Sequence, residues 1–533
     1  MQEFFEKAVL MLVGRIILLA ALSFIAAAAA AETVLNYDLH AVSHKFMGIG
    51  AQIWSGDSSV EPLPADLKMG FVRLDPGPSW SSIGQAPPTD GLRSSFDKFV
   101  AENYSQARLS NMQASFEMLK RQNVQSIFVQ FHVPDRWRDL YGKLRSDNHS
   151  DYAMLWGAVL NYLACHDIRA DYIEMFNEPE GTWNCKVPPQ DYNDILKLVR
   201  QELDERGFAD VPIIGPGLAY LDHDDGGENW IGALDDDAVS SLGGFSTHAW
   251  DESFEPDCAP DFLRHRWTDF IDAVRAKDPS GTKPIFITEY MTGARFFHGE
   301  QYPSPGGGYS YSASDEPAFA ARVFENSLSM LKGGANALLL WEAADQYWSD
   351  DGWGLQRRGS DGSTKRPAYF AVKTLFGQLP PESLVLAAPV QPQSGIYTAA
   401  FKHLDKVYLA AVNGTEYEKT LSVEFAGTGD FVSSRGSAYI NGTVSNGSIL
   451  YALYGNRVEI SLPCDTVLTV SLKRGDTDFG DFNGDGISDG EDLRIFAGGW
   501  LADVPDFDLD LNNDNKVSWE DFALIPGDWR LNE

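Results

Sequence analysis

Two glutamates are the residues of this sequence best placed for chemistry, because each stands at the polar end of an apolar run. Glu178 belongs to Tyr-Ile-Glu-Met-Phe-Asn-Glu-Pro-Glu-Gly (172–181), and Glu289 belongs to Pro-Ile-Phe-Ile-Thr-Glu-Tyr (284–290). A carboxylic acid can protonate a leaving oxygen, while a neighbouring carboxylate attacks the carbon that this oxygen leaves. Two facing carboxylates with these roles hydrolyse glycosidic bonds, so this chemistry is our first hypothesis for the pair.

Short apolar runs predict the strands that hold these glutamates, and helical patterns lie between them. The alternation predicts a parallel sheet covered by helices, and eight repeats favour a closed (β/α)8 barrel, an α/β fold, over an open sheet. No GxGxxG follows the first run, which argues against a dinucleotide-binding fold. The eight runs span residues 46–54, 70–75, 125–133, 171–179, 211–217, 243–250, 283–290 and 335–343. Helical patterns include Phe96–Arg121, Asp191–Arg206, Leu263–Lys277 and Pro317–Lys332.

Strand counting places Glu178 at the end of the fourth strand and Glu289 at the end of the seventh. Catalytic groups of such barrels lie at the carboxyl ends of the strands. Simple alternation predicts that Glu174, Phe176 and Glu178 face the barrel interior. The same rule gives Glu289 the face of Ile285 and Ile287.

The strand-end motifs resemble those of the clan A glycoside hydrolases. Asn177-Glu178-Pro179 stands on the fourth strand and Thr288-Glu289 on the seventh, and the Glu-x-x-Asn-Glu-Pro form is most similar to families 39, 30 and 51. The resemblance spans roughly residues 40–475. It implies a retaining mechanism with Glu178 as acid/base and Glu289 as nucleophile. It also implies that Arg73 keeps the nucleophile ionised, unless Arg73 pairs with Asp75 or Glu174 instead.

Further residues are expected to bind the sugar. His132 and His248 match polar positions of the clan's cleft, although either could be a hydrogen-bonded core histidine. Trp341 fits the sugar platform, unless it packs in the barrel. Many clan members have a tyrosine after the histidine of strand six, where this chain reads His248-Ala249-Trp250. Tyr290 and a tyrosine of the loop 293–316 are candidate substitutes, and the alternative is that the contact is absent. The full set of expected substrate-binding residues is Asn177, Arg73, His132, His248, Trp250, Tyr290, Trp341, Trp54 and Trp183.

The remaining chain predicts three further parts. Residues 382–474 alternate apolar and polar positions between Asn-Gly and Gly turns, which predicts an antiparallel β-sandwich after a barrel domain of residues 32–381. The segment Thr33–Asp38 is a candidate for a further strand of this sandwich. Residues 1–31 combine basic residues, an apolar stretch and an alanine run, which predicts a cleaved secretory signal; a membrane anchor is the alternative.

The last part, residues 475–533, contains a duplicated loop with the ligand spacing of calcium-binding loops. A helical pattern follows the first copy, and the pair resembles a type I dockerin module. The resemblance implies structural calcium and a cohesin-like scaffold partner; the alternative is a solvated acidic tail. The expected ligands are Asp481, Asn483, Asp485, Ile487, Asp489 and Asp492 in one loop and Asp510, Asn512, Asp514, Lys516, Ser518 and Asp521 in the other.

The composition of the chain argues against some classes of binding partner. A net charge of −34 argues against nucleic acid and anionic membranes as partners. Four cysteines allow two disulfides, of which Cys185–Cys258 is the favoured pair. We therefore expect a secreted retaining glycoside hydrolase, without a catalytic cofactor, that cleaves β-type bonds of plant or algal poly- or oligosaccharides. The alternative is a non-catalytic carbohydrate-binding or scaffold-associated protein with a degenerate barrel. Family 39 resemblance would imply xylosides, family 30 glucans or glucuronoxylans, and family 51 arabinofuranosides.

Overall fold

The computed structural model describes most of the chain. The described residues are 34–78, 80, 83, 85–219, 230–251, 259–292, 296–297, 300–301, 313–345, 353–357, 364–387, 396–415, 417–440, 442–474 and 490–500. The predicted signal segment 1–31, Cys258 and the calcium ligands 481–489 and 510–521 lie outside them. The predicted helix after the first calcium loop is present as α12 (Gly490–Trp500), which contains Asp492.

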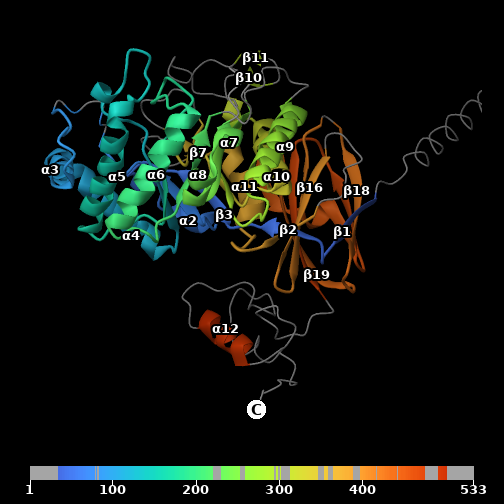
Figure 1. Cartoon of the computed structure of the whole chain (residues 1–533). Helices are drawn as coiled ribbons and strands as arrows, with labels where there is room; N and C mark the ends of the chain where they lie inside the picture. The colour runs from blue at the N-terminus through green and yellow to red at the C-terminus, as the bar shows by residue number, and fades with distance from the viewer. Residues whose placement is uncertain are drawn as a thin grey trace, which may run out of the picture.

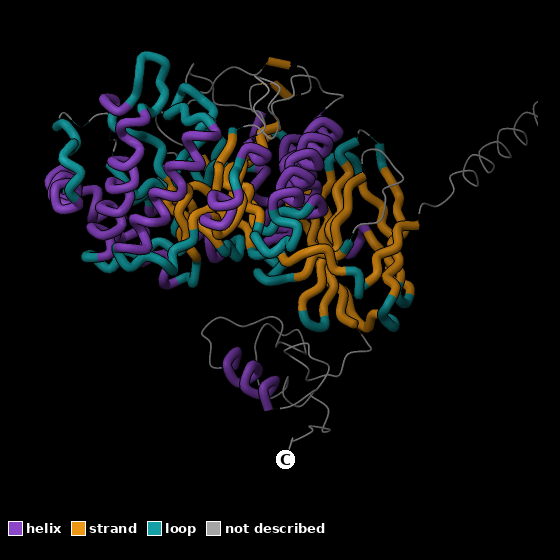
Figure 2. Tube along the Cα trace, in the orientation of Figure 1, coloured by secondary structure: helices purple, strands orange, loops and turns teal. Residues whose placement is uncertain are grey.

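A closed parallel barrel of eight strands forms the centre of the molecule, as predicted. Helices surround its strands on the outside (Figures 1 and 2). The sheet runs in chain order and closes between the last strand and the first. The strands are β3 (Gly48–Gln52), β4 (Phe71–Leu74), β5 (Gln125–Val129), β6 (Tyr172–Glu174), β7 (Ile213–Leu218), β8 (Leu242–Asp251), β9 (Ile285–Thr292) and β12 (Ala337–Leu340).

The helical layer confirms most of the predicted helices and divides one of them. The pattern over 96–121 is two helices, because Tyr104 is extended and Ser105 caps the second, accepting a bond from the backbone N–H of Arg108 at 3.2 Å. The helices are α2 (Pro62–Asp66), α3 (Arg93–Asn103), α4 (Gln106–Arg121), α5 (His149–Ala164), α6 (Pro189–Glu205), α7 (Trp230–Ala233), α8 (Asp236–Ser241), α9 (Ala259–Lys277), α10 (Pro317–Gly333) and α11 (Pro367–Phe376). Short 3-10 turns are η1 (Ser58–Val60), η3 (Asp135–Trp137), η4 (Ser146–Asn148), η6 (Ala313–Asp315) and η7 (Gly447–Leu450).

The barrel interior is layered. Apolar side chains fill its amino-terminal half, as an interior cluster of Phe71, Ile127, Ile214, Phe286, Ala337 and Leu339. Two positions after Phe71, Phe286 and the partly buried Tyr172, which packs against this cluster, come the fully buried polar residues Arg73, Thr288 and Glu174. The barrel interior therefore has an apolar layer of side chains and, next to it towards the carboxyl ends of the strands, a polar and charged layer.

A two-sheet antiparallel sandwich stands beside the barrel (Figure 1) and has its own apolar core. One sheet has the order β1-β18-β22-β21 and the other β2-β15-β16-β17-β23-β19-β20. β1 (Val34–Asp38) pairs with β18, which confirms that the amino-terminal segment adds a strand to the sandwich. The other strands are β2 (Val42–Lys45), β15 (Leu384–Leu386), β16 (Ile396–His403), β17 (Lys406–Asn413), β18 (Lys419–Ala426), β19 (Phe431–Ile440), β20 (Thr443–Asn446), β21 (Tyr451–Tyr454), β22 (Arg457–Leu462) and β23 (Thr466–Arg474).

Helix α10 joins the two bodies, since it contacts β9 of the barrel and β15, β16, β17 and β23 of the sandwich, while α11 packs against α10 and contacts β19, β20 and β23. Two short hairpins complete the described elements, β10 (Phe296–Phe297) with β11 (Glu300–Gln301) and β13 (Gln356–Arg357) with β14 (Thr364–Lys365). Among the described residues, no helix is both long and apolar enough to cross a membrane. Cys185 is a buried free thiol, so the expected disulfide from Cys185 to Cys258 is wrong.

Candidate active site

Arg73 on β4 is the charged centre of the barrel mouth. Its side chain is fully buried, and Nε donates to Oε2 of Glu174 at 2.9 Å while Nη2 donates to Oδ1 of Asn177 at 2.6 Å. Nη1 forms an ion pair with Oε1 of Glu289. The guanidinium also lies 5.2 Å from the ring centroid of Phe131. The two open alternatives for Arg73 are therefore both realised, because it pairs with Glu174 and with Glu289 together.

Glu174 on β6 is the structural carboxylate of the group. Besides Arg73, it accepts hydrogen bonds from the hydroxyls of Ser246 at 2.6 Å and Thr288 at 2.8 Å, and it is fully buried. These donors come from β4, β8 and β9, which are not adjacent to β6, so they reach Glu174 across the barrel interior. A carboxylate with this many fixed donors orients Arg73 and is poorly placed to react.

Glu178 reaches the site through an irregular turn after β6. The strand ends at Glu174, and Phe176 then stacks on Tyr152 of α5 at 4.5 Å between ring centroids, in the helical layer. The prediction that Phe176 faces the interior is therefore wrong. Glu178 has a φ of 52°, a left-handed conformation that is uncommon outside glycine, and its backbone N–H donates to the carbonyl of Gly217 at 2.9 Å. Such strain is often retained at functional positions.

Glu289 points inward because β9 contains a β-bulge. Consecutive residues of β8, Thr247 and His248, pair with Ile287 and Glu289 of β9, so Thr288 is left over between them. The pairing of β9 with β12 shifts at the same place, between Leu338 and Leu340. Strand β9 therefore holds one extra residue here. Thr288 and Glu289 consequently both face the interior, a re-aiming that bulges near active sites commonly produce.

Three residues next to this bulge differ from simple alternation. Ile285 and Ile287 belong to the core between barrel and helices, so the prediction that they share the face of Glu289 is wrong. Tyr290 also faces outward, and its hydroxyl lies 2.9 Å from that of Ser327 on α10. The expected role of Tyr290 as a substitute tyrosine in the cleft is wrong for the same reason.

His248 bridges the two candidate catalytic glutamates. Its Nδ1 lies 3.0 Å from Oε1 of Glu178 and 3.4 Å from Oε2 of Glu289. One atom of each of the three side chains lies within 4.8 Å of the other two. This short separation suits the retaining geometry, in which the carboxyl groups are about 5–5.5 Å apart, better than the inverting one of about 6.5–9.5 Å.

The three titrating groups shift one another's pKa. Burial lowers the pKa of His248, but Glu289 and Glu178 raise it more, so it lies above its usual value. Burial raises the pKa of Glu289, and despite the opposing effects of His248 and Arg73 it stays above the usual value. Burial also raises the pKa of Glu178, but His248, the Trp183 hydrogen bond and Arg73 leave it below the usual value. In the free protein, Glu178 is thus held as a carboxylate.

Aromatic rings line one side of the site. Trp54 lies 5.6 Å from Phe131 and 6.2 Å from Trp341, measured between ring centroids, and all three follow barrel strands. The indole N–H of Trp54 donates to Oε2 of Glu342 at 2.7 Å. This arrangement is consistent with the expected sugar platform at Trp341, because apolar faces of sugar rings stack on aromatic planes.

The other expected binding residues occupy different places. Trp250 lies 5.2 Å from Trp353 at the rim, and the half-exposed Trp183 donates its indole N–H to Oε2 of Glu178. Asn177 is buried against Arg73. His132 is exposed on the loop after β5, and no described contact joins it to either glutamate. Phe131, the residue before it, is the side chain of this loop that lies over Arg73, and a role of His132 in sugar binding stays a prediction.

Some residues of the site carried no clear sequence signal. Glu342, buried next to Trp341, and Phe131, over Arg73, were not expected. Strict alternation along this strand puts Phe131 on the same face as Ile127 and Val129, and would have predicted Phe131 for the site in preference to His132. No comparable rule finds Glu342, since it follows the end of β12 where the chain is irregular.

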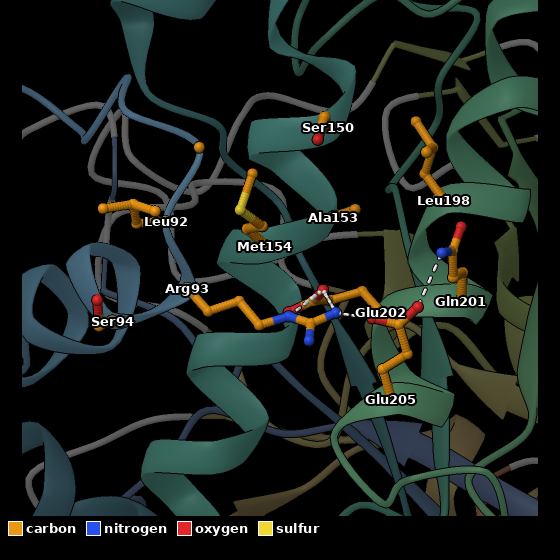
Figure 3. Close-up of a pocket in the computed structure, with 11 residues that line it drawn as sticks. Leu92, Arg93, Ser94, Ser150, Ala153, Met154, Leu198, Gln201, Glu202 and Glu205 are labelled. Carbon is orange, nitrogen blue, oxygen red and sulfur yellow. Dashed lines mark hydrogen bonds and ion pairs between the residues drawn. The ribbon is translucent and has the colours of Figure 1, made fainter.

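A groove of about 580 Å³ lies elsewhere, on the outer helical face between the start of α3 and helices α5 and α6 (Figure 3). Arg93 crosses it and pairs with Glu202 at 2.8 Å and with Glu205. None of its 11 lining residues belongs to the glutamate cluster. Its three charged side chains pair with one another, so it is not a candidate for chemistry.

Comparison with known proteins places the fold. No protein-family model and no curated protein sequence matches the chain. The family 30 subfamily 8 xylanase from Clostridium acetobutylicum superposes with a TM-score of 0.61 at 14% identity, over 82% of this chain and 99% of its own. A family 30 endoxylanase from Clostridium papyrosolvens superposes with a TM-score of 0.60 at 16% sequence identity, and the match covers 83% of this chain and 100% of the endoxylanase chain. The family 51 arabinofuranosidase from Xanthomonas axonopodis superposes with a TM-score of 0.58 at 12% sequence identity, and the match covers 83% of this chain and 100% of the arabinofuranosidase chain.

The chain shares its fold with these family 30 and family 51 glycoside hydrolases. The expected resemblance to families 30 and 51 is confirmed at the level of the fold, barrel and sandwich together. At 12–16% identity the chemistry of these neighbours does not transfer by likeness alone, and it must be argued from the site itself.

Proposed function

We propose that the protein is a secreted retaining glycoside hydrolase that acts by double displacement, with Glu178 as acid/base and Glu289 as nucleophile. One observation carries this proposal: two glutamates at the ends of strands four and seven, with His248, lie within 4.8 Å of one another above a buried arginine. A degenerate, non-catalytic barrel would have no reason to keep two carboxylates in this costly arrangement.

The two steps follow from the positions of the groups. Glu178 donates a proton to the glycosidic oxygen while Glu289 attacks the anomeric carbon, so the bond to the leaving group breaks and a glycosyl ester forms. Glu178, now a carboxylate, takes a proton from water, whose oxygen displaces Glu289 and restores the starting configuration. Arg73 stabilises the carboxylate of Glu289 before attack and after its release, through the ion pair between them.

The substrate is proposed to be a neutral sugar in β-type linkage. The aromatic side of the site and the net charge of −34 both disfavour polyanions. Structural neighbours of the chain include a xylanase, an endo-β1,6-glucanase and an arabinofuranosidase, so aryl xylosides, glucosides and arabinofuranosides are the first probes.

Replacement of Glu178 tests the acid/base role. We expect Glu178→Ala to lower turnover by about 10²–10⁴-fold on substrates whose leaving group needs a proton. A dinitrophenyl glycoside, whose leaving group needs none, should form the intermediate at nearly the normal rate. Added azide should then intercept it and give a glycosyl azide of retained configuration. Glu205→Ala, on the outer groove, is the control, and equal losses on both classes of leaving group would contradict the role.

For residues 475–533 we propose two structural calcium ions and docking to a cohesin-like partner, on the strength of the duplicated loop. Chelation with EDTA should release calcium while hydrolysis stays within about twofold, because no step of the proposed chemistry uses a metal. Calorimetric titration measures the ions, and Asp481→Ala with Asp510→Ala is the matched variant. Loss of hydrolysis on chelation would instead indicate a metal-dependent reaction.

A further inference from the structure

Both oxygens of the Glu178 carboxyl group have hydrogen-bond partners. Oε1 faces Nδ1 of His248 at 3.0 Å. Oε2 accepts the indole N–H of Trp183 and, more weakly, the side-chain amide of Asn184 at 3.4 Å. The second oxygen is the one that the exposed indole covers, on the side of the rim.

A general acid needs one oxygen that carries a proton and can reach the leaving group. A carboxylic acid has a single O–H, and an oxygen that accepts two N–H bonds has no room for it. The geometry seen here thus holds Glu178 in the form of a base. One donor has to leave Oε2 before the acid step of the proposed function.

The three partners of the Glu178 carboxyl group differ in how easily they can leave. His248 is fully buried and faces both glutamates, and Asn184 also donates to the backbone carbonyl of Asn177 at 3.2 Å. Trp183 is 55% exposed on the loop after β6. The indole is therefore the donor whose movement disturbs the least packing.

The backbone below the indole fixes its present position. The Trp183 ring folds back over Gly181, where a Cβ would lie only 2.2 Å from Cε2 of the ring. The φ of Gly181 is not in the left-handed region, so alanine fits its backbone and clashes chiefly with the indole. Gly181 is what allows the ring to reach Glu178.

We propose that Trp183 is a removable hydrogen-bond donor: it holds Glu178 as a carboxylate in the free protein, and the leaving-group part of the substrate displaces it, which lets Glu178 carry the proton. This rests on the proposed function. Trp183 is then a positioning residue that acts through Glu178, and its freed ring face is available to stack on the incoming sugar.

Charged groups that face Glu178 influence its pKa together with the Trp183 hydrogen bond. They are His248 from β8, Glu289 from β9 and Arg73 from β4, and the structure shows each of them influencing the pKa of Glu178 or being influenced by it. A donor to the carboxylate favours its charged form, so removal of the indole N–H raises the pKa of Glu178. The acid must be protonated to act, hence the basic limb of kcat/KM moves to higher pH.

Trp183→Phe tests this with an aromatic ring that lacks the N–H. The probe is whichever 4-nitrophenyl xyloside, glucoside or arabinofuranoside the protein cleaves. We expect the basic limb of kcat/KM to rise by about one pH unit, the size of one hydrogen bond to a charged group. Gly181→Ala, which keeps the indole but pushes it away, should shift the limb in the same direction.

The controls separate this inference from the proposed function. With a dinitrophenyl glycoside the shift should vanish, because that leaving group needs no proton. A basic limb that stays in place in both variants, while Glu178→Ala still loses activity, would overturn the inference alone. Activity that does not depend on Glu178 at all would overturn the proposed function. A role in packing only would lower kcat or stability without moving the limb.

Discussion

Glu289→Ala is expected to reduce hydrolysis of an aryl glycoside by about 10⁴–10⁶-fold, the largest effect of any single change in the molecule. Without this carboxylate no glycosyl ester can form, and water would have to attack across a gap that the side chain filled. The loss should appear in kcat for every leaving group, unlike the loss in Glu178→Ala. Steady-state rates on dinitrophenyl and 4-nitrophenyl glycosides distinguish the two variants.

Added azide tests this prediction through the configuration of the product. A small anion can occupy the space of the missing carboxylate and attack the anomeric carbon directly, so the product is a glycosyl azide of inverted configuration. Glu459→Ala, an exposed strand residue of the sandwich, is the matched control and should behave as the unmodified protein. A Glu289→Ala variant that keeps a tenth of its activity without azide would contradict the nucleophile role.

Arg73→Met is expected to lower the free energy of unfolding by about 3–5 kcal/mol, which is the range for removal of one partner from a buried ion pair. The change leaves the carboxylates of Glu174 and Glu289 buried without their shared cation. Urea unfolding at pH 7 measures the loss. The double variant with Glu174→Gln should recover part of it, because one of the two unpaired charges is then gone.

The pH dependence of this loss has a definite direction. The pKa of Glu289 is already raised by burial, and removal of Arg73 raises it further. A carboxyl whose folded pKa lies above its unfolded value makes the native state bind more protons than the unfolded state, so stability falls as the pH rises between these two values. The deficit of Arg73→Met should therefore be smaller at pH 5 than at pH 7. An equal deficit at both would contradict the assignment of the loss to unpaired carboxylates.

The barrel and the glutamate pair were predictable because both rest on periodic local signals. Each barrel strand lies in a short apolar run, and the first two polar residues after Phe176 and after Ile287 include the two candidate catalytic glutamates. The sandwich was equally predictable from alternation and turn residues.

The orientation of individual side chains was not predictable, because single extra residues decide it. The bulge of β9 turns Glu289 inward and Tyr290 outward, against the alternation set by Ile285 and Ile287. The early end of β6 sends Phe176 into the helices. Both irregularities depend on contacts with distant strands, which a local pattern does not contain. Phe131 was missed for a different reason, since the residue type of the adjacent His132 outweighed the parity of Phe131.

The most direct test of Glu289 as the nucleophile is mass spectrometry of the protein after reaction with a 2-deoxy-2-fluoro aryl glycoside of the sugar that it cleaves. Fluorine slows both steps, and a good leaving group lets the first step run, so the glycosyl ester accumulates. We predict one sugar per chain, attached to the peptide that contains Glu289. A sugar on any other residue, or cleavage of the unmodified glycoside with inversion and no trapped ester, would contradict it.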